Sequence, residues 1–425
     1  MRTGITHINL LGMASGRFRI VTWFITALFA TGFIPAASAQ VQLPLENSGR
    51  RKPVIQVNRE SSLWKYIDSL QVIDTHEHIA SEQELLNRNV DVFNLFTPYI
   101  VDNLQSAGMP DDQIRMLGDP ETDFSRKWDL FRNYYPLIKS TTYFKALQAA
   151  LEHQYNLNSI SFDEFKRISD LLKKEYSNKG FMQRIININR IESILTYRQA
   201  ALQEVRKKYG ENSIYVVPTV SDLTLKNKQD LRKFSAIFEK DASTLDEIIM
   251  GIDTLFSEYN TLGIKNIKFG SAYNRRLNYT LRTRDEAERA FNELMISQPA
   301  NPNRIEARLL TSTQIVLDDY ITFHMITLAQ TYDMNVVFHM GLAAWNYNTV
   351  KNSHASDLEW LIQMFPKVNF VILHAGYPFF EEGILLAKYY PNVFLNMTWD
   401  HIIERDRSVE AMKSYLEMLP LNKIH

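Results

Sequence analysis

Short apolar runs alternate with longer segments of helical periodicity along the second half of the chain. After a first run at 72–76, further apolar runs lie at 192–197, 214–220, 266–270, 335–341, 369–375 and 392–396. Between them, apolar residues recur at helical spacing, as at 245–259, 315–332, 356–365 and 409–419. Strands that alternate with helices predict a parallel sheet of the α/β class, here with seven strands.

Polar residues with metal-binding side chains end the first of these runs. Asp74, His76 and His78 alternate, and side chains two positions apart in a strand point to the same face. Two imidazoles that project together at a strand end form half of a site for Zn²⁺ or a similar ion. A histidine pair with a purely structural role is the alternative interpretation.

Two later strands end in the same way. His339 closes the run at 335–339 and is followed by Met340 and Gly341, and His374 closes the run at 369–374 and is followed by Ala375. In a parallel barrel the carboxyl ends of the strands carry the active site. Three strand ends with histidines therefore predict one shared site more readily than three separate packing roles.

Two cations are candidates for binding substrate. Lys268 lies inside a predicted strand, where burial of its charge is costly unless the ammonium is paired or modified. It could bind substrate, carry a carbamate that bridges metals, or face a polar groove. Arg275 lies on the following loop and could clamp a carboxylate, or be an exposed loop charge.

A helical, aromatic-rich segment at 81–190 separates the first strand from the second. Because it leaves the first strand directly after His78, we expect it to emerge on the face that carries the site and to cover its mouth. Its many aromatic residues are expected to form a small core of their own. The domain prediction is therefore a barrel at 61–425 that contains this helical insert.

The first residues have the pattern of an export signal. Arg17 and Arg19 precede an apolar run at 20–34, and the sequence Ala37-Ser38-Ala39 gives the small residues of a cleavage site. We expect a signal peptide at 1–39, cut after Ala39, and a linker at 40–60. The predicted location is the periplasm or the exterior, with no stable membrane anchor.

The amino-acid composition gives no support to nucleic-acid binding and excludes cysteine chemistry. The 425 residues include 47 Lys and Arg against 48 Asp and Glu, a net charge of −1, so nothing indicates a nucleic-acid partner. There is no cysteine, which excludes disulfides, thiolate metal ligands and a cysteine nucleophile. A metal would have to be held by His, Asp, Glu or a modified Lys. The expected partner is a small-molecule substrate, and the oligomeric state is open.

The residues that run from Val72 to His78, together with His339 and His374, resemble the motifs of the amidohydrolase superfamily, specifically its amidohydrolase-related branch. The insert, at 143–151 and 162–165, also resembles the region after strand one in uronate isomerases. The resemblance implies a (β/α)8 TIM-type barrel and a divalent metal ion, with zinc the first choice. It implies that His76, His78 and His339 bind the metal and that His374 acts as the acid or base.

The family normally completes this site with an aspartate at the end of strand eight, and the chain stops at His425, where that strand should begin. Either the sequence is a fragment whose reading frame continues, or the protein is a degenerate barrel that binds without turnover. If the chain as given is active, another residue must supply the carboxylate, and Asp400 is the first to test. The expected activity is a metal-dependent hydrolase that uses metal-activated water on a small carboxylated or sugar-derived substrate. A decarboxylase or uronate-type isomerase, and a non-catalytic binding protein, are the alternatives.

Overall fold

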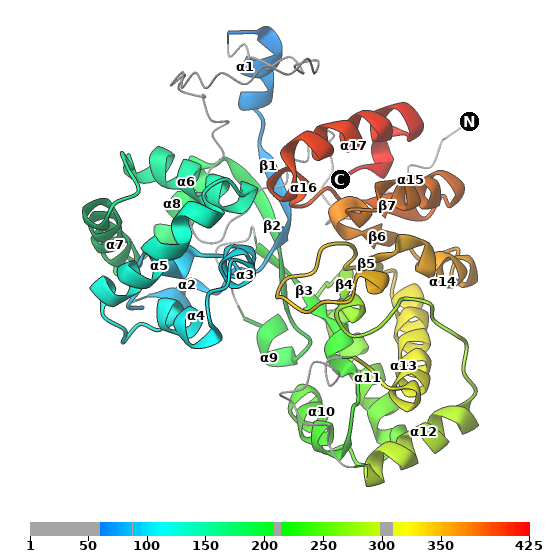
Figure 1. Cartoon of the computed structure of the whole chain (residues 1–425). Coiled ribbons are helices and arrows are strands. Elements are labelled where there is room, and N and C mark those ends of the chain that lie inside the picture. The colour runs from blue at the N-terminus through cyan, green and yellow to red at the C-terminus, as the bar shows by residue number, and fades with distance from the viewer. Residues whose placement is uncertain (1–59, 87, 208–213, 298–308) are drawn as a thin grey trace.

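Seven parallel strands lie side by side in their order along the chain (Figure 1). The computed structural model describes residues 60–86, 88–207, 214–297 and 309–425; the proposed signal peptide at 1–39 and all but the last residue of the proposed linker at 40–60 lie outside them. The sheet curls as in a (β/α)8 barrel, which confirms the predicted fold class. Its strands are β1 (Val72–Glu77), β2 (Ile191–Gln199), β3 (Ile214–Thr219), β4 (Asn266–Phe269), β5 (Asn335–Phe338), β6 (Phe370–Ile372) and β7 (Val393–Leu395).

Side chains alternate between the two faces of the curled sheet. In β5, Val336 and Phe338 pack into the large core beneath the helices, whereas Val337 packs with Val371 and Phe394 in a separate cluster on the inner face. The period of two then places the next residue after Phe338 on the inner face, and that residue is His339.

Helices cover the outer face of the sheet. The α11 helix begins with a capping box, in which Thr244 accepts the N–H of Glu247 while the Glu247 carboxylate accepts that of Thr244. None of the helices in the described ranges is long and apolar enough to cross a membrane. The described helices outside the segment between β1 and β2 are α1 (Ser62–Asp68), α9 (Leu202–Val205), α10 (Leu231–Phe238), α11 (Leu245–Thr261), α12 (Arg284–Ile296), α13 (Ser312–Thr331), α14 (Glu359–Met364), α15 (Phe380–Tyr389), α16 (Asp400–Ile403) and α17 (Arg405–Met418).

A bundle of helices lies between β1 and β2 and forms its own core, beside the sheet in Figure 1. Phe93, Phe131, Phe144 and Phe165 are buried at its centre. These rings pack edge-on or stacked with centroids 5.6–5.9 Å apart, as aromatic side chains prefer. The helices are α2 (Glu82–Leu85), α3 (Pro98–Ser106), α4 (Asp111–Gly118), α5 (Phe124–Ile138), α6 (Thr142–Tyr155), α7 (Phe162–Tyr176) and α8 (Phe181–Ile188).

The last described residues run beside β7. Ile424 forms an isolated parallel bridge with Leu395, the His425 N–H donates to the Leu395 carbonyl (2.7 Å) and the Met397 N–H donates to the His425 carbonyl (2.8 Å). At the carboxyl ends, the Asn396 side-chain amide donates to the Thr75 hydroxyl (2.8 Å), so β7 also contacts β1. This hydrogen bond draws the two outer strands of the sheet together at the end that carries the histidines.

Candidate metal centre at the carboxyl ends of the strands

The four predicted histidines lie together at the carboxyl ends of three strands. His76 is within β1 and His78 directly follows that strand, His339 directly follows β5, and His374 lies in the short turn after β6. The ring centroids of His76 and His78 are 5.1 Å apart, those of His76 and His374 are 5.6 Å apart, and those of His339 and His374 are 4.9 Å apart. The fold thus gathers residues separated by up to 298 positions (374 − 76) into one cluster.

Burial holds these imidazoles in the neutral form that binds metals. It lowers the pKa of His76 and of His339 well below the usual value, and the nearby Lys268 charge lowers both further. Burial also lowers the pKa of His374 to about 3 and that of His78 to about 4. The His78 side chain is nevertheless accessible to solvent, although protein atoms surround it on most sides.

Several ring nitrogens in the cluster have an unused lone pair or proton. His76 Nδ1 and His339 Nε2 are buried without a hydrogen-bond partner, which is costly unless a ligand takes that place. His374 Nδ1 lies 2.9 Å from the Thr398 carbonyl, so this nitrogen carries the proton and Nε2 keeps its lone pair.

The arrangement of donors fits a divalent cation in its chemistry but not yet in its geometry. Over the described ranges, no three His, Asp or Glu side chains converge closely enough to hold a metal ion as they stand. The neutral imidazoles and the two unpartnered nitrogens nevertheless supply the ligand type that zinc and similar ions prefer. The rings would have to move before their nitrogens could share one ion.

Lys268 is the cation of this cluster. It lies in β4, only 5% exposed, and the alternation of the strand places it on the inner face. Its Nζ lies 4.4 Å from the centre of the Tyr197 ring, and burial lowers the pKa of the ammonium well below its usual value. A positive charge on Lys268 lowers the pKa values of all four histidines further.

Arg275 forms ion pairs inside the protein, whereas the sequence indicated it as a candidate for substrate binding. Its buried guanidinium forms ion pairs with Asp318 (2.9 Å) and Asp319 (2.7 Å) and packs over the Tyr279 ring. Its Nε–H donates to the Arg276 carbonyl (2.9 Å). Because the donors of this side chain are used within the protein, we leave it out of the proposed site.

Two buried carboxyls lie near the strand ends. Asp74 accepts the N–H of His76 (3.1 Å), and burial raises its pKa well above the usual value. Asp400, a carboxylate considered from the sequence as a candidate for the site, is 1% exposed, and neither of its oxygens has a hydrogen-bond partner. Burial raises the pKa of Asp400 well above its usual value.

Three aromatic side chains surround the histidines and were not among the predicted site residues. Tyr197 lies 4.2 Å from His76, Tyr273 lies 4.6 Å from His339 and Trp399 lies 5.7 Å from His374, measured between ring centres. The alternation in the run at 192–197 could have placed Tyr197 on the inner face. Trp399 follows no such pattern, because it lies in a turn with a left-handed φ of 69°.

The helical insert contacts the loops that carry this cluster. Tyr99 in α3 packs edge-on against Trp399 (4.7 Å) and stacks on Tyr143 in α6 (4.5 Å). The carboxylate of Asp102 accepts the N–H of Trp345 (2.9 Å), in the loop after β5. The insert therefore lies against the carboxyl ends of β5 and β7, on the face where the histidines lie.

Comparison with known proteins identifies the fold. The structure is similar to a uronate isomerase from Thermotoga maritima, with a TM-score of 0.63 and 13% identity over 83% of this chain and 81% of that one. It is also similar to a glucuronate isomerase from Caulobacter crescentus, with a TM-score of 0.61 and 15% identity over 84% and 79% of the two chains. These neighbours agree with the resemblance seen in the sequence, and at this identity they show the fold.

Sequence comparison reaches only part of the chain. Protein fluG of Emericella nidulans is 31% identical over 114 residues, which cover 25% of this chain. The match spans only 13% of the length of that curated relative. No protein-family model matches the chain.

Proposed function

We propose that the chain is a metal-dependent enzyme that hydrolyses a small carboxylated or sugar-derived molecule. The observation that carries this proposal is the gathering of four neutral imidazoles, two of them with unpartnered nitrogens, at the carboxyl ends of three parallel strands. His76, His78 and His339 would hold a divalent cation, with zinc the first choice. That cation would act as a Lewis acid on water or on a substrate oxygen.

The remaining side chains have separate tasks in this proposal. The bond from His374 Nδ1 to the Thr398 carbonyl fixes the ring, so its Nε2 is the atom that can accept and return a proton. The Lys268 ammonium would bind an anionic oxygen of the substrate, which compensates for the loss of its own hydration. The aromatic rings of Tyr197 and Trp399 pack against His76 and His374 and would help to hold these imidazoles in place.

Isomerisation of a sugar acid is the second candidate. It is favoured by the fold comparison, because the two neighbours described above are a uronate isomerase and a glucuronate isomerase. The same cluster could serve it, with the cation on the substrate oxygens and a basic group that moves a proton between adjacent carbons. Fold alone does not separate the two reactions.

Isotope incorporation separates these reactions. The protein, loaded with Zn²⁺ or Mn²⁺, is incubated with uronates, lactones and small amides in H₂¹⁸O and in D₂O. Hydrolysis places ¹⁸O in the product carboxylate, whereas isomerisation places deuterium on carbon. Binding of metal and substrate without either isotope would favour the non-catalytic alternative, and failure to bind metal would contradict the whole proposal.

The place of action is the cell envelope or the exterior. The signal-peptide pattern at 1–39 supports export, and the proposal is a small-molecule enzyme of the periplasm without nucleic-acid partners.

A further inference from the structure

His78 is more exposed than the other three histidines, and its ring is hydrogen-bonded to the backbone of Tyr197 in β2. His76, His339 and His374 are at most 3% exposed, so packing holds their rings. His78 is solvent-accessible and lies just beyond the last residue of β1. Its N–H donates to the neighbouring Glu77 carboxylate (3.1 Å) and therefore does not tie this residue to a distant element.

The pairing of β1 with β2 is also interrupted immediately before His78. Asp74 lies opposite Ile194 and Glu77 lies opposite Thr196, so β1 advances three residues while β2 advances two. Such a bulge bends a strand and re-aims the side chains near it. An additional contact is needed to fix the direction in which the chain leaves the sheet.

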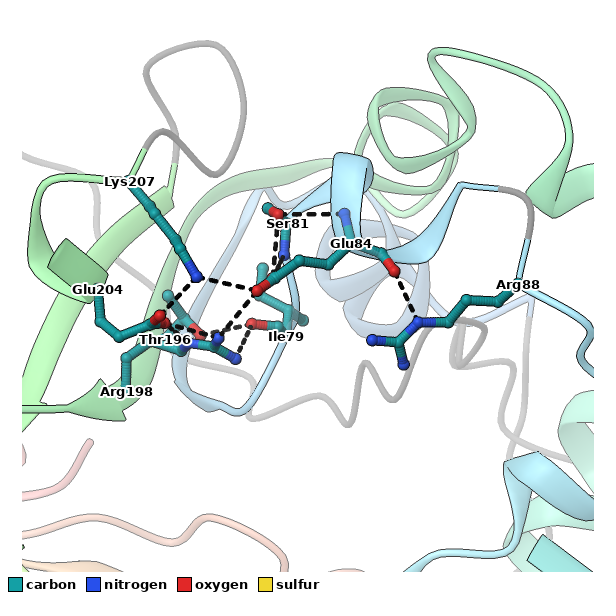
Figure 2. Close-up of polar contacts among 8 residues, drawn as sticks. All are labelled: Ile79, Ser81, Glu84, Arg88, Thr196, Arg198, Glu204 and Lys207. Carbon is teal, nitrogen blue, oxygen red and sulfur yellow. Dashed lines mark hydrogen bonds and ion pairs between the residues drawn. The ribbon is translucent and has the colours of Figure 1, made fainter. Parts of the chain in front are cut away.

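That contact comes from the outward face of β2 (Figure 2). The carbonyl of Ile79, the residue after His78, accepts hydrogen bonds from the Thr196 hydroxyl (3.4 Å) and from Arg198 Nη1 (3.3 Å). The residue between these two donors, Tyr197, points inward and lies against His76. The inward face of β2 therefore contacts His76 and His78 through Tyr197, and its outward face holds the backbone of the next residue, Ile79.

Arg198 is itself held in place by a cluster of charges that joins three elements. Its Nε and Nη2 donate to one Glu204 oxygen in α9 (3.2 and 2.8 Å), and Nη2 lies 3.7 Å from Glu84 in α2. Lys207 bridges the same two carboxylates and lies 3.0 Å from Glu84. Figure 2 shows these side chains around the segment that follows His78.

Glu84 continues the connection back to that segment. Its second oxygen accepts the N–H of Ser81 (2.8 Å) and the Ser81 hydroxyl (3.0 Å), which closes the capping box of α2. The segment is thus held by Arg198 at Ile79, and by Arg198 and Lys207 at Glu84.

We propose that Arg198 is a positioning residue that sets the direction of the His78 imidazole through the Ile79 carbonyl. This inference rests on the proposed function, in which His78 is a metal ligand. Arg198 need not touch the metal or the substrate. Groups that orient metal ligands from behind typically change metal affinity about 10–100-fold when they are removed.

Metal affinity measured by competition with a chelator tests this inference. With Zn²⁺ alone as the probe, Arg198→Met should bind about 10–100-fold more weakly than the wild-type protein. Arg206→Met is the matched control, because it removes ion pairs to Glu239 and Glu258 that lie farther along the same region. The control should keep wild-type affinity for Zn²⁺. Arg198→Lys keeps the charge on a single donor nitrogen, so its affinity should lie between those of the wild-type protein and Arg198→Met.

A double-mutant cycle separates positioning from general loss of structure. In a His78→Ala background, Arg198→Met should change the affinity for Zn²⁺ less than twofold, because the ligand through which Arg198 acts is gone. An equal loss in both backgrounds would overturn the proposal, as would wild-type affinity in Arg198→Met alone.

A readout in the metal-free protein keeps the two proposals distinguishable. The ¹⁵N signals of the His78 ring, assigned with His78→Gln, should shift or broaden in Arg198→Met and stay unchanged in Arg206→Met. Absence of metal binding by the wild-type protein would defeat the proposed function but not this result. Identical His78 signals in the wild-type and Arg198→Met proteins would defeat the positioning role.

Discussion

Histidines at strand ends were visible in the sequence because two simple patterns coincide at them. An apolar run marks each strand, and its polar end marks the rim of the barrel, so His76, His339 and His374 could be placed together before any coordinates. Arg275 shows the limit of this reasoning. Its partners Asp318 and Asp319 lie in α13, and no local pattern reveals an ion pair between elements so distant in sequence.

Asp102 is the residue whose ionisation most directly links the insert to the barrel. Burial raises its pKa to about 6, while the N–H of Trp345 donates to its carboxylate and partly offsets this. In the folded protein it therefore binds a proton that the unfolded chain has already lost. Stability should fall as pH rises from about 4 to about 6 and stay level above that.

Replacing Asp102 by Asn tests this assignment. The amide oxygen can still accept the Trp345 N–H but cannot ionise, so the variant should lose the fall in stability between pH 4 and 6. The free energy of unfolding of the variant minus that of the wild type, measured with urea, should be about 1–2 kcal/mol larger at pH 7 than at pH 4. Parallel pH profiles for the two proteins would show that Asp102 titrates normally.

The sequence predicts where helices and strands lie along the chain better than it predicts the type of each helix or the pairing of the strands. The observed β4 (Asn266–Phe269) and α11 (Leu245–Thr261) lie within two residues of the expected 266–270 and 245–259. The segment at 356–365 is instead a 3₁₀ turn followed by the short α14. The bulge in β1 was also not foreseen, because one extra residue changes the pairing without changing the apolar pattern.

The insert contains a buried ion pair that offers a test of its core. Lys127 Nζ lies 2.7 Å from Asp91, with the Lys127 side chain fully buried. Asp91→Ala would leave this ammonium without its partner and should cost about 3–5 kcal/mol in urea unfolding. The added change Lys127→Met should recover part of the loss, because it removes the buried charge.

Asp129→Ala is the control for that experiment. Asp129 pairs with Arg132 at the surface, where both side chains are at least half exposed, and such pairs contribute little. The control should cost less than about 1 kcal/mol. A loss in Asp91→Ala no larger than in the control would mean that the buried pair does not stabilise the insert.

At the scale of the whole molecule, the fold comparison and the sequence comparison cover different amounts of the chain. The fold of the two isomerases spans more than four fifths of it, whereas the match to protein fluG covers 25%. Many different sequences share the same alternation of apolar strands and helices. The fold can therefore be kept after most individual residues have changed. The fold could therefore be predicted from pattern, but the reaction depends on individual side chains that the pattern does not constrain.

Export is a property of the whole molecule that can be checked without knowing the reaction. If the pattern at 1–39 is a cleavable signal, the protein purified from the periplasm should begin at Gln40. Mass spectrometry of the intact protein and of its N-terminal peptide would show this. An N-terminus at Met1 or Met13 in the envelope fraction would contradict cleavage.

In this account the histidines at the strand ends form one metal centre. The decisive measurement is the metal content of the protein after chelator treatment and reloading with Zn²⁺. The wild-type protein should hold about one ion per chain or a small whole number, and His76→Ala and His339→Ala should each lose it. His153→Ala, which changes an exposed histidine of α6, should retain it. Stoichiometric zinc in both His76→Ala and His339→Ala, or none in the wild-type protein, would contradict the account.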